Sequence, residues 1–267
     1  MLRIPLAPFA APSWLKDGAL ALRKAGGMAL DLLYPPACLA CRRAVSRHGG
    51  LCPDCWSAMR FIERPYCERL GTPFEADFSA GANGRTISPA ALADPPVFQR
   101  ARAVARYEEG PARQLVHRLK YGDRDELAGP MGLWMARAGE ELLGEADLLV
   151  PIPLHWTRLA RRRFNQSAAL ARAIAKASAV PVATELLIRV KPTPPQVGLT
   201  RRLRAQNIQG AFAAPEARRI DVKGRRIVLV DDVMTSGATL NAAARVLRRA
   251  GANQVDALVF ARVVAES

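Results

Sequence analysis

No part of the sequence is a long, uninterrupted apolar run. None of its segments reaches the roughly 18 consecutive apolar residues that a helix needs to span a bilayer, so we do not expect an integral membrane protein. The mildly apolar stretch at residues 1–27 is interrupted by charges at Lys16, Asp17, Arg23 and Lys24, and it lacks the basic, apolar and small-residue succession of a secretory leader. We therefore expect a cytoplasmic protein with no transmembrane segment.

Acidic residues are scarce relative to basic ones. Asp and Glu total 24 against 39 Lys and Arg, which gives a formal net charge of +15. Such an excess favours encounter with phosphates, nucleic acid or anionic lipid, although it carries no information about the fold. Because 50% of the residues are hydrophobic, the chain can still bury the core of one large domain or of two unequal ones.

Two common phosphate-binding motifs are missing. The sequence contains neither GxxxxGK[ST] nor GxGxxG, which excludes an ordinary P-loop and a standard dinucleotide-binding turn. It also shows no internal repeat and no low-complexity tract. Any phosphate site must therefore be built from another kind of loop.

Cysteine is absent outside one short segment. All five cysteines lie between Cys38 and Cys67, in a stretch punctuated by prolines and poor in bulky apolar residues. "CLAC" and "CPDC" each offer two thiolates from one tight turn, and four thiolates complete a tetrahedral zinc shell. The predicted ligands of a structural zinc ion are Cys38, Cys41, Cys52 and Cys55.

Two alternative interpretations of these cysteines are less favoured. Disulfides are disfavoured by the expected compartment and by the odd cysteine count, and a redox CxxC needs only one pair. Cys67 is expected to be a free thiol, and His48 a solvated loop residue rather than a replacement ligand.

The segments divide the chain into four parts. We expect an N-terminal packing helix at 1–33, a zinc-ribbon module at 34–80, a linker with a first strand at 81–110, and an α/β domain at 111–267. A membrane-surface role for the first helix is the less favoured alternative. After residue 110 helical and extended patterns alternate, which is typical of a parallel sheet with helices on both faces.

Individual elements follow from the same patterns. The expected strands lie at 100–107, 146–154, 184–190, 225–233 and 254–264, and the expected helices at 111–122, 126–143, 165–178 and 238–251.

The stretch "IVLVDDVMTSGATL" at 227–240 places two acids at the end of an apolar strand and a small, hydroxylated loop before a helix. In parallel sheets ligands bind outside the carboxyl ends of the strands, and a helix N-terminus offers unpaired N–H groups to an anion. Two carboxylates facing that anion would repel it, so they are better placed to accept hydrogen bonds from adjacent sugar hydroxyls. The stretch therefore predicts a ribose 5-phosphate site, against the alternative of an Asp-Asp turn with no ligand.

The predicted ligand-binding residues are Asp231, Asp232, Val233, Met234, Thr235, Ser236, Gly237, Ala238 and Thr239, with Asp231 and Asp232 as the expected catalytic pair.

These residues carry a resemblance to a known family. "VLVDDVMTSGAT" resembles the phosphoribosyl pyrophosphate signature of type I phosphoribosyltransferases. Together with "VPIPLHWTRLARRRFNQSAALA", "QVGLTRRLRAQNIQGAF" and the cysteine module, it resembles the ComF proteins associated with competence for natural transformation, including the ComFC and GntX groups. The likeness covers residues 34–264, with two departures: Leu70 stands where a sixth cysteine is common, and Arg163 where glycine is usual.

The resemblance implies a fold and an activity. The expected fold is a type I phosphoribosyltransferase-like parallel sheet flanked by helices, with a small N-terminal zinc-ribbon module. The expected function is binding of phosphoribosyl pyrophosphate with Mg²⁺ and transfer of phosphoribose to an unknown acceptor, in a protein linked to DNA uptake.

Basic residues concentrate where this ligand would need them. Between positions 151 and 210 Glu185 is the only acid, and arginines can neutralise a leaving pyrophosphate. The predicted pyrophosphate and lid residues are Arg158 and Arg162 after Pro153, and Arg204 and Asn207 in a segment that could close over the site. For Arg172 and Lys176 a solvated helix face is favoured, and Lys120 is left open between a helix-end cation and a ligand contact.

A second function keeps the fold without the chemistry. A zinc ribbon and a basic surface are compatible with a non-catalytic, single-stranded nucleic-acid-binding or regulatory protein. Few aromatic residues accompany the basic segment, and Trp156 and Phe164 are expected to be packed rather than available for base stacking.

Overall fold

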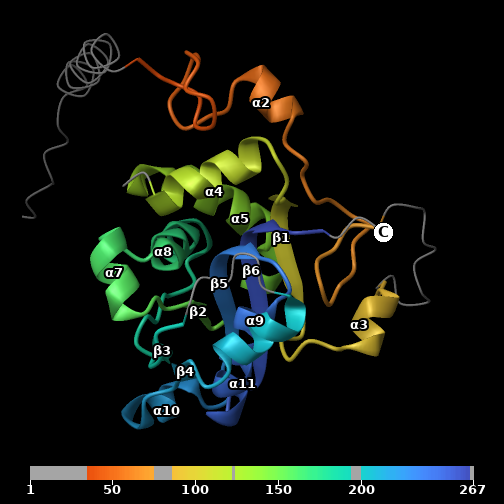
Figure 1. Cartoon of the computed structure of the whole chain (residues 1–267), viewed down its shortest axis with the longest axis vertical. Coiled ribbons are helices and arrows are strands. Elements are labelled where there is room, and N and C mark those ends of the chain that lie inside the picture. Colours follow the sequence, from red (N-terminus) through yellow and green to blue (C-terminus); the bar gives the residue numbers. More distant parts are fainter. Residues whose placement is uncertain (1–34, 75–85, 122–123, 194–199, 265–267) are drawn as a thin grey trace, which may run out of the picture.

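A four-stranded parallel sheet forms the centre of the molecule (Figure 1). The computed structural model describes residues 35–74, 86–121, 124–193 and 200–264, so the expected helix at 1–33 lies outside the described residues. The strand order is β1-β6-β5-β2, and all three pairings are parallel. The strands are β1 (Ala101–Arg106), β6 (Gln254–Arg262), β5 (Arg226–Met234) and β2 (Leu148–Pro151). This arrangement confirms the predicted α/β class.

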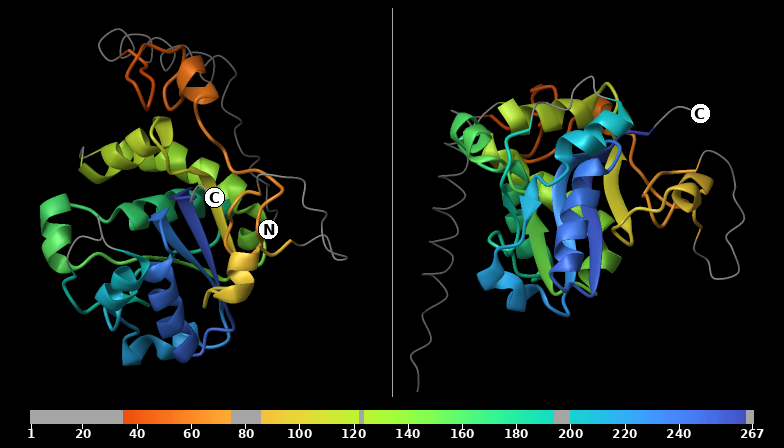
Figure 2. Two further views of the ribbon diagram at one scale, coloured as in Figure 1. Left: turned by 45° about the vertical axis from the view of Figure 1, so that its right-hand side comes forward. Right: turned by 60° about the horizontal axis from the view of Figure 1, so that its bottom comes forward.

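Successive residues of the central strand β5 contribute to two separate cores, because neighbouring side chains of a strand point to opposite faces of the sheet. Val228 and Val230 belong to one apolar cluster and Ile227 and Leu229 to the other. Helices contribute to both clusters and so cover both faces of the sheet (Figures 1 and 2). On the first face these are α4 (Pro111–Tyr121), α5 (Ala128–Ala138) and α8 (Gln166–Ser178), and on the second α11 (Ala238–Arg249).

Both edges of the sheet are covered, which removes unpaired strand edges. Beside β1, Phe61 forms an antiparallel bridge with Ala105, and the N–H of Ile62 donates to the carbonyl of Val104 at 2.9 Å. Beside β2, Leu149 forms a parallel bridge with Val182.

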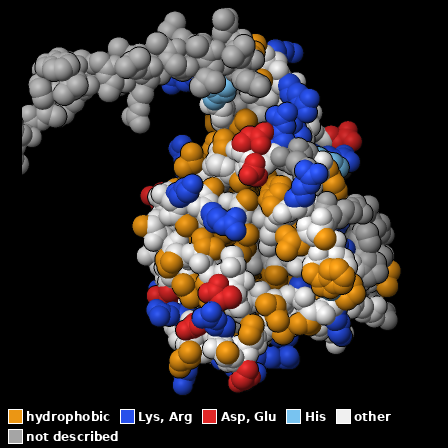
Figure 3. All heavy atoms as spheres, turned by 90° about the vertical axis from the view of Figure 1, so that its left-hand side faces the viewer, with side chains coloured by type: hydrophobic (Ala, Val, Ile, Leu, Met, Phe, Trp, Pro, Cys, Tyr) orange, Lys and Arg blue, Asp and Glu red, His pale blue; other side chains and the backbone are white. Residues whose placement is uncertain are grey.

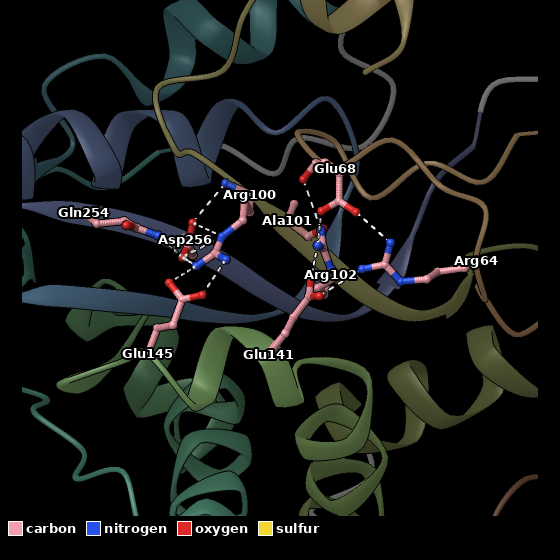
Figure 4. Close-up of polar contacts among 9 residues, drawn as sticks. All are labelled: Arg64, Glu68, Arg100, Ala101, Arg102, Glu141, Glu145, Gln254 and Asp256. Carbon is pink, nitrogen blue, oxygen red and sulfur yellow. Dashed lines mark hydrogen bonds and ion pairs between the residues drawn. The ribbon is translucent and has the colours of Figure 1, made fainter. Parts of the chain in front are cut away.

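A buried ion network joins the cysteine-containing segment to β1 (Figure 4). The side chain of Arg102 is only 2% exposed, and its guanidinium pairs with the carboxylates of Glu68 and Glu141. The ring of Tyr66 stacks on Arg102 and Arg64, with centroid distances of 4.6 and 4.9 Å. Because an unpaired buried charge is costly, this network holds residues 64–68 firmly against the sheet.

Several elements differ from the expectations. The helix expected at 126–143 is divided into η1 (Asp125–Leu127), α5 and α6 (Glu140–Leu143). Gly139 lies between α5 and α6, where an added Cβ would be 2.8 Å from both Cδ atoms of Leu258. The strand expected at 184–190 is reduced to β3 (Ile188–Arg189), which pairs antiparallel with β4 (Phe212–Ala213) in a small second sheet.

The structure also contains short helices that the sequence analysis did not predict. They are α2 (Pro53–Ser57), α3 (Pro89–Ala93), α7 (Trp156–Arg162), α9 (Arg201–Ile208), η2 (Glu216–Arg218) and α10 (Arg219–Val222). None of the helices within the described residues combines the length and the apolar character that crossing a lipid bilayer requires.

Candidate functional site

The acid pair lies near the carboxyl end of strand β5. Two helices, α4 and α8, supply its ion-pair and hydrogen-bond partners. Alternate residues of a strand point to the same face of the sheet, so Asp232 lies on the same face as Val228 and Val230. Its carboxylate therefore faces the layer that contains α4. There the Nζ of Lys120 lies 3.0 Å from Asp232 Oδ1. The hydroxyl of Ser167, at the start of α8, donates to Asp231 Oδ1 at 2.9 Å, and the N–H of Asp232 donates to the same oxygen at 3.0 Å.

The electrostatics of the pair are unusual. Burial, together with the neighbouring carboxylate of Asp232, raises the pKa of Asp231 to about 7. Burial opposes the charge of Lys120, but Asp232 outweighs it and raises the pKa of that ammonium group above its ordinary value. The site therefore holds the ammonium group of Lys120, which stays charged at neutral pH, and the carboxyl group of Asp231, which ionises near neutral pH.

An anion cradle follows directly after the acids. Gly237 precedes α11 with φ of +77°, a backbone conformation that favours glycine, and no side chain caps the helix. The Oγ of Ser236 is buried and has no hydrogen-bond partner among the described residues. The helix itself provides no acceptors for the N–H groups of its first turn, and the Ser236 hydroxyl beside them is buried, so this loop forms a suitable site for a phosphate group.

The other residues of the predicted loop divide into two groups. The side chain of Met234 is buried in the core, and Val233 and Ala238 pack against it, so only their backbone atoms could reach a ligand. Thr235 and Thr239 are half-buried on either side of Ser236 and Gly237.

Two arginines, from α7 and β3, are linked to each other and to the acid pair. Arg158 of α7 donates through Nη2 to the carbonyl of Thr193 at 2.6 Å, and Arg189 of β3 donates to the hydroxyl of the same residue. Burial, and then the nearby Arg158, lowers the pKa of Arg189 to about 10, while Asp231 acts in the opposite direction. Arg158, Arg189 and Asp231 are thus electrostatically coupled. The Nε of Arg189 is buried without a partner among the described residues.

The remaining predicted basic residues are placed less directly. Arg162 donates to Gln166 Oε1 at 3.3 Å and lies over the ring of Tyr121, 5.2 Å from its centroid. Arg204 and Asn207 belong to α9, which packs against α11, the helix that begins at the cradle. The side chains of Arg161, Arg201 and Arg202, and residues 194–199, lie outside the described part of the chain.

Three residues join the site from outside the predicted set. Lys120, left open by the sequence, contacts an acid of the pair, and Ser167 and Arg189 were not predicted at all. Ser167 lies two residues after Asn165, the N-cap of α8, so its place at a helix start could be recognised in the sequence. Its contact with Asp231 depends on the tertiary fold. Arg163, at the position where the resemblance led us to expect glycine, has φ of +61°, in the left-handed region that favours glycine.

The four predicted metal ligands come together. The Sγ atoms of Cys38, Cys41, Cys52 and Cys55 all lie within 4.8 Å of one another. Cys41 and Cys52 are 3.7 Å apart, close to the separation of about 3.8 Å that tetrahedral Zn–S bonds of about 2.3 Å impose. Among the described residues this is the one cluster of such ligands suited to a metal ion. It is consistent with a zinc ribbon and supports a structural zinc.

The thiol pKa values show why the cluster suits a cation. Burial opposes ionisation of Cys38, but backbone N–H groups of Cys41, Cys52 and Ala40 outweigh it and lower its pKa to about 6. Burial, followed by the neighbouring thiols, raises the pKa of Cys55. Four crowded thiols cannot all ionise unless a positive charge lies between them, and zinc supplies that charge.

Cys67 occupies a turn with the same pattern of backbone hydrogen bonds as the first cysteine turn. In the first, Cys38 N–H donates to Arg43 O at 2.8 Å and Arg42 N–H to Cys38 O at 3.0 Å. In the second, Cys67 N–H donates to Thr72 O at 2.8 Å and Gly71 N–H to Cys67 O at 2.7 Å. Cys67 is a buried free thiol that accepts from the N–H and the hydroxyl of Ser88, both at 3.2 Å, so Ser88 is its partner.

Comparison with known proteins assigns the chain to a family. A model described as "Double zinc ribbon domain" matches residues 29–84, and one described as "Phosphoribosyl transferase domain" matches residues 165–266. The DNA utilization protein YhgH of Escherichia coli K12 is 33% identical over 239 residues, which cover 87% of this chain and 100% of that protein. The chain belongs to the ComF/YhgH family. The resemblance to ComF proteins is therefore confirmed.

The comparison also found proteins to which this ComF/YhgH chain is less similar. The competence protein F of Haemophilus influenzae is 29% identical over 233 residues, covering 84% of this chain and 96% of that protein. Among solved structures, the glutamine phosphoribosylpyrophosphate amidotransferase of B. subtilis is 22% identical with a TM-score of 0.33, over 53% of this chain and 30% of that one.

Proposed function

We propose that this ComF/YhgH protein binds phosphoribosyl pyrophosphate with Mg²⁺ and transfers its phosphoribosyl group to a nitrogenous acceptor. The observation that carries the proposal is the sequence of groups along one loop: an acid pair of which Asp232 is buried and Asp231 half-buried, a buried Ser236 hydroxyl without a partner among the described residues, and a positive-φ Gly237 before a helix. These groups match, in order, sugar hydroxyls and a 5-phosphate.

The residues would divide the chemistry between them. In the transfer, the bond from C1 of the ribose to a pyrophosphate oxygen breaks, the electron pair leaves with the pyrophosphate, and the acceptor nitrogen bonds to C1 and loses its proton. Asp231 and Asp232 accept hydrogen bonds from the ribose or offer carboxylate oxygens, which Mg²⁺ prefers as ligands. Mg²⁺ would supply charge neutralisation for the leaving pyrophosphate.

The arginines extend the same electrostatic role. Arg158 and Arg162 lie on α7, and Arg204 and Asn207 on α9. We assign them to the pyrophosphate and to closure over the site, and we add Arg189, whose buried Nε lacks a partner. Fixed cations that stabilise charge developing on a leaving group are among the largest contributions to catalysis.

Transfer is tested by a screen of bases and amines for release of pyrophosphate from phosphoribosyl pyrophosphate and Mg²⁺. The proposal expects acceptor-dependent release that Asp231→Asn and Asp232→Asn abolish. Hydrogen exchange locates the ligand: amides of residues 235–239 should exchange more slowly when it is bound, whereas those of α5 should not change. Release that is independent of the acid pair, or protection elsewhere only, would refute the assignment.

A second candidate function, binding of single-stranded nucleic acid, is favoured by a specific observation. The expectation that Trp156 is packed was wrong, because Trp156 is 71% exposed, whereas Phe164 packs against the core as expected. Tyr121 is 62% exposed and carries the guanidinium of Arg162 over its ring. Exposed aromatic rings beside arginines are the elements that stack bases and hold phosphates in sequence-tolerant binding.

The surface around α7 supports the same candidate. On the face at the left of Figure 1, where α7 lies, Lys and Arg side chains are spread among apolar ones (Figure 3). The names of two relatives, a DNA utilization protein and a competence protein, also point towards DNA.

Fluorescence anisotropy with labelled oligothymidylate tests this candidate. We expect salt-sensitive binding that Trp156→Ala with Tyr121→Ala weakens by about tenfold or more, since stacking contributes about 1–3 kcal/mol per base. Ile220→Ala, which removes another exposed side chain, is the matched control and should bind normally. Absence of binding at low salt would eliminate the candidate.

For the cysteine cluster we propose one zinc ion per chain, held by Cys38, Cys41, Cys52 and Cys55. Elemental analysis of freshly purified protein should find one equivalent. Cys67→Ser should leave that value unchanged, because Cys67 is bound by Ser88. Finding no zinc, or a second equivalent that Cys67→Ser removes, would contradict the proposal.

A further inference from the structure

Helix α4 contacts the cysteine cluster on one side through Arg118. The Nη1 of Arg118 donates to the carbonyls of Leu39 and Ala40, the latter at 3.2 Å. Both carbonyls belong to the turn between Cys38 and Cys41, so their position depends on that turn being folded. Burial, followed by the neighbouring Arg124 and Arg42, lowers the pKa of Arg118, whereas Glu126 and Cys38 act in the opposite direction.

Zinc would improve the electrostatic surroundings of Arg118. Four thiolates around Zn²⁺ leave the cluster with net negative charge, and Cys38 already acts on Arg118 in the favourable direction. Loss of the metal would therefore loosen the turn that carries the carbonyl acceptors and reduce the negative charge near Arg118.

The same helix contacts the acid pair through Lys120, two residues further on. Two residues advance an α-helix by roughly 200°, so Arg118 and Lys120 project to nearly opposite sides. Nζ of Lys120 lies 3.0 Å from Asp232 Oδ1, and both side chains are largely shielded, at 21% and 9% exposure. Leu115, Val116 and Leu119 of α4 are fully buried, so the helix is a rigid body between the two contacts.

We infer that α4 couples the cysteine cluster to the acid pair, with Arg118 sensing the metal and Lys120 acting as a positioning residue for Asp232. Metal occupancy then strengthens binding of the phosphoribosyl ligand, and by reciprocity the ligand strengthens binding of the metal. We expect the tighter binding to appear as slower release of the metal. The ligand half of the inference rests on the proposed function. The contact between Lys120 and Asp232, and its effect on the cluster, does not.

The rate of zinc transfer to a chromogenic chelator tests the coupling without any ligand. Lys120→Met should release zinc at least about fivefold faster than the wild type does. Asp232→Asn breaks the same contact from the other side and should have the same effect. Lys120→Arg keeps the charge and should restore a rate near that of the wild type. Lys176→Met, an exposed lysine of α8, is the matched control and should change nothing.

Arg118→Met serves as the reference for direct loss of the contact to the turn. If Arg118→Met releases zinc quickly while both Lys120→Met and Asp232→Asn release it at the wild-type rate, the coupling is refuted. Thermal melting by circular dichroism verifies that each variant is folded, and Asp232→Asn decides the question if Lys120→Met does not fold.

The ligand half is measured by repeating the release with phosphoribosyl pyrophosphate and Mg²⁺. Wild-type release should slow by about fivefold, and Lys120→Met should lose that protection. If calorimetry shows no binding to the wild type, the proposed function fails, while the ligand-free rates still decide the coupling. If the ligand binds the wild type but leaves the rate unchanged, the coupling fails and the proposed function stands.

Discussion

The carboxyl group of Asp231 makes stability depend on pH. Its pKa in the folded protein is raised to about 7 by burial and by Asp232, whereas an unfolded Asp ionises at about 3.9. Between these values the folded state binds the extra proton, so the stability contributed by the protonated group is complete below about pH 4 and is lost as pH rises through 7.

Asp231→Asn isolates this effect, because Asn does not titrate. Relative to the wild type, the variant should gain free energy of unfolding on the order of 1–3 kcal/mol between pH 5 and pH 8. Urea unfolding at the two pH values measures it. A difference between the two proteins that does not change with pH would show that Asp231 ionises normally.

The backbone conformation of Arg163 also affects stability. Its φ of +61° is in the left-handed region, which costs an L-residue roughly 1 kcal/mol. Arg163→Gly and Arg163→Ala both remove the side chain, but only glycine relieves the backbone. The glycine variant should therefore be more stable than the alanine variant by about 1 kcal/mol in thermal or urea unfolding, and equal stabilities would mean that the turn is not strained.

Among the elements, the contact between α5 and α8 depends on one glycine. A Cβ at Gly132 would lie 2.4 Å from the Cβ of Ala173, whereas a Cβ at Gly129 of the same helix meets nothing within 4 Å. Gly132→Ala should therefore cost about 1–3 kcal/mol of the free energy of unfolding because the helices must separate. Gly129→Ala, the matched control, should be neutral or stabilising by about 0.5–1 kcal/mol. Equal effects of the two changes would contradict the packing.

Elements with a strong local pattern were predictable from the sequence. The apolar run of β5 and the periodic α11 were expected at 225–233 and 238–251 and lie at Arg226–Met234 and Ala238–Arg249. The division of the helix after Ala138 was not predicted, because it depends on contact with Leu258 from a distant strand. α7 and α9 lie in segments whose charge and prolines conceal short helices.

The candidate site was predictable to the same degree. The acids and the glycine loop are contiguous, so their order alone indicates a ligand. Lys120, Ser167 and Arg189 come from α4, α8 and β3, and only the three-dimensional fold brings them to Asp231 and Asp232. The exposure of Trp156 was missed for the same reason, since a large aromatic side chain is expected to be packed and only the fold shows that it is exposed.

At the scale of the whole molecule, one protein of the ComF/YhgH family combines a four-cysteine cluster with a phosphoribosyltransferase-type sheet. The two parts share structure: residues 60–62 extend the sheet beside β1, Arg102 pairs with Glu68, and α4 contacts both the first cysteine turn and the acid pair. The cysteine module is therefore part of the architecture that supports the site, and the excess of basic residues is consistent with anionic ligands.

Isothermal titration calorimetry with phosphoribosyl pyrophosphate and Mg²⁺ tests the central claim most directly. The wild type should bind one equivalent per chain, and Asp231→Asn with Asp232→Asn should weaken binding by about tenfold or more, because hydrogen bonds to charged groups contribute about 1.5–3 kcal/mol each. Asp125→Asn, an exposed acid of η1, should bind as the wild type does. No heat of binding to the wild type, or unchanged affinity in the double variant, would contradict the assignment of this loop as a phosphoribosyl site.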